Sequence, residues 1–226
     1  MCSDDSWASD GFITVPRVLT ESECDSLIVL TRPAAPDSPG TRNLLSLDWC
    51  KALADRLGRH TELASLIPAD SVAVQCTYFE KSVARNWLVP IHQDLSIPVA
   101  ERVPSPELRV WSEKEGTLFV QPPVEVLHKL VAVRVHLDRC SQEDGPLQVI
   151  PGTHEQGLIN SRLANRLRRR GPVVTCTMER GDALVLRPLL LHSSSKAAGT
   201  SLRRVLHCLF GPPELPLGLR WHGSLG

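Results

Sequence analysis

The sequence lacks the features that mark several classes of protein. Lysine plus arginine and aspartate plus glutamate number 25 each, so the formal net charge is zero, and we expect neither nucleic acid nor a membrane surface as a partner. No apolar stretch approaches the ~20 residues of a membrane span, and the acidic start MCSDDSWASD does not resemble a secretory signal. The seven cysteines include no Cys-x-x-Cys pair, which favours reduced thiols in a cytoplasmic protein over disulfides or a structural zinc site.

Length and composition predict one domain over residues 1–226, since 42% of the residues are hydrophobic. Helices are expected early and short strands later, with a long irregular stretch from 90 to 123. This order favours a mainly β jelly-roll sandwich with flanking helices. A helix is expected over 21–31, opened by a capping box at Thr20 to Glu23, and a second over about 48–57, capped by Ser46 or Asp48 and ended by Gly58. A third helix is expected over 160–170. The expected strands are 71–80, 127–138, 147–150, 173–178, 183–187 and 203–210.

A His-x-Asp or His-x-Glu triplet can supply two metal ligands, and the sequence contains three: His60 to Glu62, His92 to Asp94 and His136 to Asp138. Two histidines and one carboxylate can hold Fe(II) and leave its other positions open. We interpret the first triplet as surface residues, because it precedes the strand-rich part of the chain. The third shares a strand face with Arg134, which would repel a cation, so a pocket or core role is favoured. The second follows Pro90 at a strand end, where residues i and i+2 point the same way, and is the strongest candidate.

Two further polar positions stand among apolar residues. His192 ends the apolar run from 183 to 191, where a lone histidine is usually a hydrogen-bonded core residue and a third metal ligand is the alternative. Arg203 and Arg204 open an apolar strand, an unfavourable place for a cation without an anionic partner. One of them can hold a dicarboxylate by a bidentate fork, or both can be surface charges of an edge strand. The residues alone leave these alternatives open.

Taken in order, the motifs of the chain resemble those of the phytanoyl-CoA dioxygenase family of Fe(II)/2-oxoglutarate oxygenases. The resemblance runs nearly end to end, and the ordered set carries it, since each motif alone is weak. One departure is Asp144, where the family often has asparagine. The motifs are Asp10-Gly11-Phe12 with Val15, Phe79-Glu80-Lys81, Asn86-Trp87 with Val89 to Asp94, Val135 to Asp138, Asp144 to Leu147, Val149 to His154, Gly181 to Ala183 continuing from Arg187 to Ser194, and Arg203 to His207.

The resemblance implies a double-stranded β-helix that binds Fe(II) through His92, Asp94 and His192, which would be the catalytic residues. It also implies 2-oxoglutarate as the cosubstrate and O₂ as the oxidant. Arg203 would bind the far carboxylate of 2-oxoglutarate, with Arg204 as the second choice. Further contacts to the cosubstrate are expected from Ser194, Gln75, Thr77 and Trp111.

The function expected from this resemblance is oxidation of a small-molecule substrate, by hydroxylation or otherwise, with release of succinate and CO₂. Phytanoyl-CoA itself is not implied as the substrate. We expect a loop over 95–120, together with 81–87, to cover the substrate side. Two alternatives are a cupin-like metal-dependent hydrolase or isomerase with the same three ligands, and a non-catalytic ligand-binding barrel. The sequence does not indicate an oligomeric state. The residues that we assign to the substrate are Arg134, His136, Lys81 and Trp87.

Overall fold

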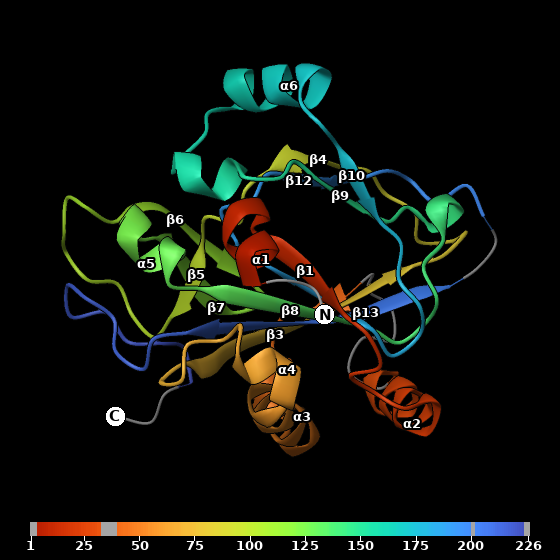
Figure 1. Ribbon diagram of the computed structural model, residues 1–226. Coiled ribbons are helices and arrows are strands. Elements are labelled where there is room, and N and C mark those ends of the chain that lie inside the picture. The colour runs from red at the N-terminus through yellow and green to blue at the C-terminus, as the bar shows by residue number, and fades with distance from the viewer. Residues whose placement is uncertain (1–3, 33–39, 200–201, 224–226) are drawn as a thin grey trace.

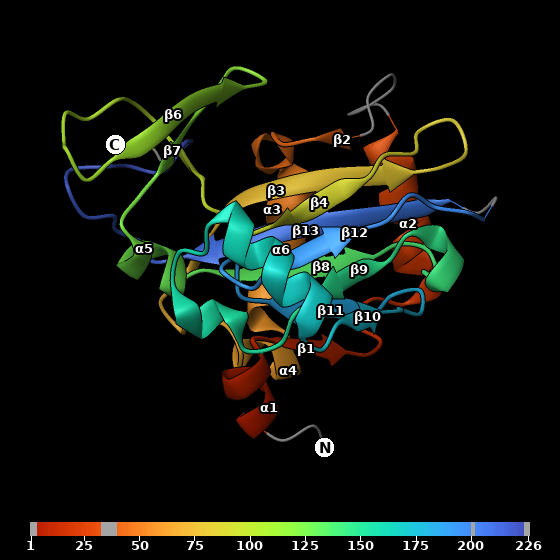
Figure 2. The same cartoon turned by 90° about the horizontal axis from the view of Figure 1, so that it is seen from above.

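The computed structural model describes residues 4–32, 40–199 and 202–223, and two antiparallel sheets packed face to face form its centre (Figures 1 and 2). The strands of the major sheet are β1 (Phe12–Val15), β2 (Gly40–Thr41), β3 (Val72–Lys81), β8 (Val131–His136), β11 (Ala183–Leu186) and β13 (Arg203–Gly211). Those of the minor sheet are β4 (Val89–His92), β9 (Leu147–Val149), β10 (Val174–Cys176) and β12 (His192–Ser194). Their orders are β1-β11-β8-β13-β3-β2 and β10-β9-β12-β4. The predicted double-stranded β-helix with flanking helices is confirmed.

Strand β8 shows how the two faces of the major sheet divide. Val133 and Val135 pack in the core on the outer side of the sheet, whereas Ala132 belongs to the core between the two sheets. Arg134 and His136 share the inner face with Ala132, because successive strand residues point to opposite faces. All residues of β8 are buried, since the strand lies between β11 and β13.

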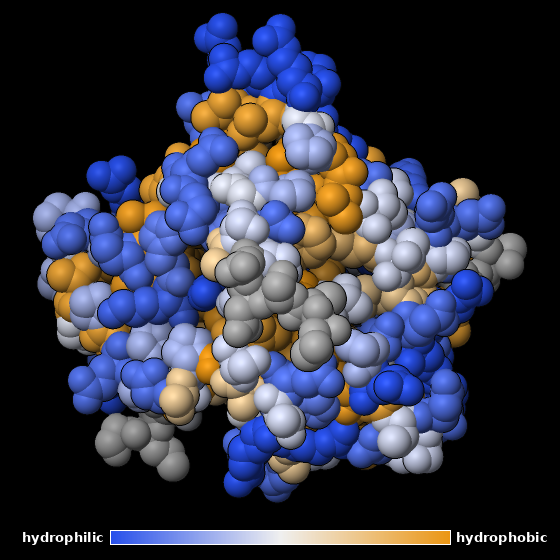
Figure 3. Space-filling model, in the orientation of Figure 1, coloured by the Kyte–Doolittle hydropathy of each residue, from blue (hydrophilic) through white to orange (hydrophobic). Residues whose placement is uncertain are grey.

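Helices cover the outer faces of both sheets (Figure 1). α2 (Glu21–Thr31), α3 (Asp48–Arg59) and α4 (Thr61–Ala64) lie beneath the major sheet, and α6 (Ser161–Arg170) lies over the minor sheet. The outer surface of α6 is hydrophilic, as the top of Figure 3 shows. Within the described ranges no helix has both the length and the apolar character needed to cross a membrane.

The first turns of α2 and α6 form where polar side chains satisfy free backbone N–H groups. Thr20 Oγ1 accepts the N–H of Glu23 at 3.3 Å, and the Glu23 carboxylate accepts the N–H of Thr20 at 2.7 Å. This is the predicted capping box. At α6 the side chain of Asn160 accepts the N–H of Leu163 at 2.9 Å, so this helix also begins at a side-chain cap.

Both ends of α3 differ from the prediction. The residue before the helix is Leu47, so neither Ser46 nor Asp48 is its N-cap, and no side-chain cap hydrogen bond is formed there. The helix also continues through Gly58 to Arg59. A glycine near a helix end costs only about 1 kcal/mol, and the buried apolar face of α3 against the major sheet offsets that cost.

The stretch from 90 to 123 was predicted to be irregular, and this was wrong. It contains β5 (Ile97–Val99), β6 (Arg109–Lys114) and β7 (Thr117–Gln121), which form a separate sheet of order β5-β7-β6 at one end of the sandwich (Figure 1). Glu115 and Gly116 join β6 to β7, both at positive φ, as a two-residue hairpin requires. No residue of β6 is fully buried, so the strand lacks the apolar alternation by which a sequence reveals it.

Several shorter elements were not predicted. β1 pairs with β11 at the edge of the major sheet, and the beginning of the predicted strand 127–138 is instead the end of a helix, so that β8 starts only at residue 131. Elements of three to seven residues show too little periodicity to be read from sequence. The other predicted strands and the 160–170 helix are present, with ends moved by one or two residues. The additional helices are α4, described above, α1 (Asp4–Asp10), α5 (Val124–His128) and the 3₁₀ turns η1 (Leu44–Ser46), η2 (Gln142–Asp144) and η3 (Thr153–Gln156).

Candidate metal centre and active-site cavity

Two neighbouring strands of the minor sheet bring two histidines together. β4 and β12 run antiparallel, and His92 and His192 are direct partners in their register. Asp94 follows His92 by two residues, just past the end of β4. Gln93 between them is buried, and its amide nitrogen donates to the Leu189 carbonyl at 2.6 Å. This bond ties the turn after β4 to the segment before β12, and so sets the carboxylate beside both rings.

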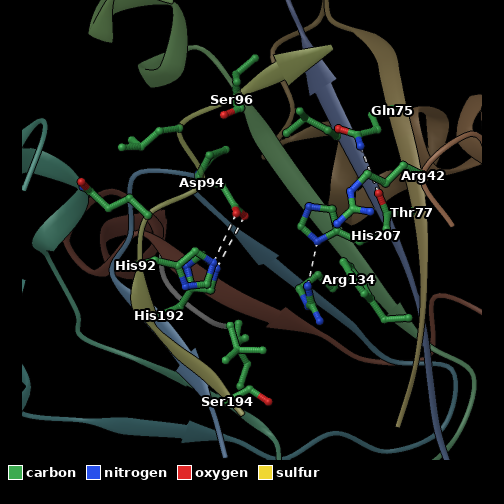
Figure 4. A pocket seen from close by; sticks show the side chains of 18 of the residues that line it. Arg42, Gln75, Thr77, His92, Asp94, Ser96, Arg134, His192, Ser194 and His207 are labelled. Atoms are coloured by element: carbon green, nitrogen blue, oxygen red, sulfur yellow. Dashed lines mark hydrogen bonds and ion pairs between the residues drawn. The ribbon is translucent and has the colours of Figure 1, made fainter. Parts of the chain in front are cut away.

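The three side chains, which we call the metal triad, converge on one point (Figure 4). Nε2 of His92 lies 3.6 Å from Oδ1 of Asp94, and Nε2 of His192 lies 3.6 Å from Oδ2. One ligand atom of each residue lies within 4.8 Å of the others. Each ring turns Nδ1 to a carbonyl at 2.8 Å, that of Pro90 for His92 and that of Leu190 for His192. A carbonyl can only accept, so Nδ1 carries the proton and Nε2 is available to a metal.

The charges in the triad suit a cation. Burial raises the pKa of the Asp94 carboxyl, but the neighbouring His192 and His92 outweigh burial and hold this pKa well below its usual range. Burial lowers the pKa of His192, which favours the neutral ring that metal binding requires. Two histidines and one carboxylate fit Fe(II), which keeps further positions open in such a site. Within the described residues, no other group of three or more such side chains is close enough to share an ion.

A cavity of about 470 Å³ lies between the metal triad and the inner face of the major sheet. Figure 4 shows Gln75, Thr77, His207 and Arg134 across the cavity from Asp94 and the two histidines. Arg203 and Ser194 also line it. The remaining described lining residues are Arg42, Phe79, Trp87, Val89, Gln93, Leu95, Ser96, Lys114, Phe119, Leu130, Leu147, Pro188 and Leu209.

Arg203 carries a buried charge that forms no ion pair in the described part of the chain, although the Asp144 carboxylate nearby favours the charged form electrostatically. Arg203 is only 4% exposed. One guanidinium nitrogen donates to the Gly145 carbonyl, and Nε has no hydrogen-bond partner. Ser194 Oγ donates to the same carbonyl at 3.0 Å and accepts from Lys81 Nζ at 2.5 Å. No described carboxylate forms an ion pair with Arg203. A buried cation of this kind favours an anionic ligand.

The neighbouring cations differ from Arg203. Arg204 points away from the cavity and pairs with Asp138, through Nη2 to Oδ1 at 2.6 Å and Nε to Oδ2 at 2.8 Å. Lys81 is buried and does not line the cavity; burial, with Arg203 nearby, lowers its pKa to about 8. Because successive residues of β13 point to opposite faces, Arg203 faces the cavity and Arg204 does not.

Two other residues assigned from the sequence lie outside the lining. Trp111, an expected cosubstrate contact, stands on β6 in the separate sheet, with its ring 5.1 Å from Cζ of Arg102, and it does not line the cavity. His136 is buried on β8 without lining the cavity. Arg134 and Trp87 do line it.

Sequence reasoning missed several lining residues, among them His207 and Arg42. A signal for His207 existed: it follows Arg203 by four residues on one strand, and such residues share a face. Arg42 and Lys114 had no such signal, because the loop after β2 and the β6–β7 hairpin meet only in the tertiary structure.

Comparison with known proteins agrees with this site. A family model described as phytanoyl-CoA dioxygenase matches residues 7–205. The chain belongs to the phytanoyl-CoA dioxygenase family. Family membership and the metal triad together identify the protein as an Fe(II)/2-oxoglutarate-dependent oxidoreductase. The predicted cofactors Fe(II), 2-oxoglutarate and O₂ are confirmed. No curated protein is similar enough in sequence to count as a match.

Solved structures share the fold of this phytanoyl-CoA dioxygenase family member at low sequence identity. The epimerase SnoN, in complex with Fe³⁺, alpha-ketoglutarate and nogalamycin RO, has a TM-score of 0.71 at 15% identity, over 98% of this chain and 88% of SnoN. AviO1 from Streptomyces viridochromogenes Tue57 has a TM-score of 0.63 at 21% identity, over 94% of each chain. HygX from Streptomyces hygroscopicus, with nickel and 2-oxoglutarate bound, has a TM-score of 0.62 at 17% identity, over 94% of this chain and 87% of HygX.

Proposed function

We propose that the protein hydroxylates a C–H bond of a small molecule. In this reaction 2-oxoglutarate loses CO₂ and gains one atom of O₂ to become succinate, and the second oxygen atom enters the substrate as a hydroxyl group. The observation that carries the proposal is that one cavity is lined both by the metal triad and by the buried Arg203, which forms no ion pair with a described carboxylate. A cupin-like hydrolase or isomerase would need the triad but not this cation.

The metal triad would hold the iron through Nε2 of His92, Nε2 of His192 and the Asp94 carboxylate. When bound, iron supplies the redox chemistry of O₂ that no protein side chain provides. The work of the chain is to fix the ligands. The hydrogen bonds from Nδ1 to the Pro90 and Leu190 carbonyls hold each ring in one tautomer and one orientation.

The far carboxylate of 2-oxoglutarate would lie against Arg203, whose planar fork matches two carboxylate oxygens. Ser194 stands beside Arg203 through their shared acceptor, the Gly145 carbonyl, and its hydroxyl would contact the same carboxylate. On β3, Gln75 donates to Thr77 Oγ1 at 3.2 Å, and both side chains would bound the cosubstrate on the major-sheet side. Together these contacts would leave the cosubstrate one orientation relative to the triad.

The rim of the cavity is built from segments far apart in the sequence. Glu115, in the β6–β7 turn, accepts from the Thr41 hydroxyl at 2.8 Å, the Arg42 N–H at 2.9 Å and the Arg42 guanidinium at 2.8 Å. We call these contacts the Glu115 clasp. The clasp holds the hairpin beside the β2 segment, so that Lys114 and Phe119 line the cavity. A rim of this kind would exclude water during the reaction.

The proposal is tested with purified protein, Fe(II), ascorbate and 2-oxoglutarate. Titration of 2-oxoglutarate into the anaerobic Fe(II) protein should give a weak visible charge-transfer band. On admission of O₂ the protein should release succinate slowly even without substrate, since decarboxylation does not strictly need a C–H bond. A screen of metabolites for a product 16 mass units heavier would then identify the substrate.

Two variants serve as controls for this test. Asp94→Ala should suppress succinate formation by removing the carboxylate ligand, whereas His60→Ala should leave it unchanged, because His60 lies outside the cavity. A protein that holds iron but shows neither the band nor oxygen-dependent succinate would instead be a metal-dependent hydrolase, an isomerase or a binding protein.

A further inference from the structure

The cavity is lined by more cationic side chains than binding of the metal and 2-oxoglutarate requires. Asp94 is the only carboxylate among its described lining residues, whereas Arg42, Lys114, Arg134 and Arg203 are cations. Arg42 forms an ion pair with Glu115 in the clasp, and Lys114 is exposed to solvent. Arg203 is assigned above to 2-oxoglutarate. Arg134 is left without a function.

Arg134 is held firmly in place. It stands at the middle of β8, opposite His207 in the register with β13, and its Nη1 lies 2.9 Å from Nδ1 of His207. Its guanidinium carbon lies 5.5 Å from the centre of the Phe79 ring. Burial and the charge of Arg134 lower the pKa of His207 to about 3, so this imidazole is a neutral acceptor and adds no charge. These contacts orient the guanidinium before any ligand arrives.

The charge of Arg134 is buried and forms no ion pair among the residues that the structure describes. The residue is 8% exposed, Nε has no hydrogen-bond partner, and no described carboxylate forms an ion pair with it. Burial and Arg203 lower its pKa to about 10, and Asp94 only partly offsets them, so Arg134 remains a cation near neutral pH. In formal charge, Fe(II), Asp94, Arg203 and the 2-oxoglutarate dianion together are neutral, and so are Lys81 and Asp144 beside Arg203. Even the loaded site therefore leaves the charge of Arg134 unbalanced. Burying an unpaired charge is costly.

We propose that Arg134 binds an oxyanion group, a carboxylate or a phosphate ester, on the molecule that the protein oxidises. This inference rests on the proposed function, because it assigns 2-oxoglutarate to Arg203. Arg134 lies across the cavity from the metal triad (Figure 4), so a substrate anchored there would extend into the space between the anchor and the triad. The guanidinium fork suits either oxyanion, because both present paired oxygens.

The test uses anaerobic Fe(II) protein saturated with 2-oxoglutarate and three matched pairs of probes: butyrate and butyramide, benzoate and benzamide, and phenyl phosphate and phenol. Binding is followed by the rise in melting temperature and by isothermal titration. We expect the anionic member of at least one pair to bind the wild type more tightly than its neutral partner. The carboxylate and phosphate pairs separate the two kinds of oxyanion.

Three variants assign the preference to a residue. Arg134→Gln should weaken the anion by about 10-fold to 100-fold, the loss expected for a hydrogen bond to a charged group, with little change for the neutral partner. Arg134→Lys keeps the charge but loses the fork, so it should retain part of the preference even if the glutamine variant does not fold. Arg204→Gln is the matched control, since Arg204 pairs with Asp138 outside the cavity, and it should bind as the wild type does.

The proposal is overturned if the wild type shows no preference for any anionic probe, or if Arg134→Gln or Arg134→Lys keeps the full preference. It is also overturned if Arg134→Gln weakens the 2-oxoglutarate band as much as Arg203→Gln does, since Arg134 would then bind the cosubstrate. A wild type that prefers anions through Arg134 but shows no 2-oxoglutarate band would refute the proposed function and leave the anion site standing.

Discussion

Replacing Arg203 by alanine should weaken 2-oxoglutarate binding strongly while the protein still folds. The guanidinium is buried and forms no ion pair in the described chain, so a bound carboxylate would meet it away from water. Removing one partner of such a desolvated pair costs about 2–5 kcal/mol, which corresponds to a rise in Kd of about 30-fold to several thousand-fold. The fold should tolerate the change, because the native protein loses a buried charge that burial itself disfavours.

Arg204→Ala is the internal control for this prediction. It breaks the ion pair with Asp138, whose side chains are 15% and 18% exposed, so the free energy of unfolding should fall by about 1–3 kcal/mol. The Kd for 2-oxoglutarate should change less than about threefold, because Arg204 does not line the cavity. The two adjacent arginines thus separate cosubstrate binding from stability.

The assay is an anaerobic titration of 2-oxoglutarate into each Fe(II) protein, read from the visible band, with urea unfolding in parallel. The reasoning is refuted if Arg203→Ala binds 2-oxoglutarate within threefold of the wild type, or if Arg204→Ala shows the larger loss. The second result would mean that β13 is shifted by one residue, since such a shift exchanges the two faces of a strand.

Two further predictions concern the triad and the rim. Alanine at any residue of the metal triad should abolish activity and weaken 1:1 iron binding in an equilibrium dialysis experiment, whereas His60→Ala and His136→Ala should still bind iron; unchanged affinity in two of the three triad variants would remove the assignment. For Glu115, burial raises the pKa, but the Arg42 N–H, the Thr41 hydroxyl and the Arg42 guanidinium together lower it by more than burial raises it. The folded pKa therefore lies below the unfolded one, so the stabilisation is present above the ordinary glutamate range and is lost as pH falls through the lowered pKa. Glu115→Gln should cost up to about 1 kcal/mol at pH 7, and urea unfolding from pH 7 to pH 3 should show this difference shrinking; a constant difference would contradict it.

Local chemistry in the sequence was enough for the elements whose signals are contained in a few residues. The capping box at Thr20 and Glu23 predicted the start of α2, and the alternation along β8 predicted which residues face the inside. The same alternation cannot reveal β6, because its residues are partly exposed on both faces. Nor could the glycine signal in α3 predict its end, because packing against the sheet decided where the helix stops.

The His-x-Asp spacing by itself left three triplets in competition; the place of His92 and Asp94 after Pro90 favoured this pair, and the order of the family motifs supported the same choice. Only the tertiary structure brings them to His192, about a hundred positions along the chain, because β4 and β12 pair side by side. Similarly, the sequence alone does not distinguish the adjacent Arg203 and Arg204. The strand separates them onto opposite faces, one turned to the cavity and the other to Asp138.

The sequence alone therefore determined the chemistry available to the protein: which ligands a metal could have and which cations could meet a dicarboxylate. The tertiary structure decided which of those groups share one cavity. It also showed what the sequence had no means to express, that Arg134 is buried opposite the triad and forms no ion pair within the described part of the chain. Burial and charge compensation depend on which strands and loops pack around a residue, and those neighbours come from distant parts of the chain.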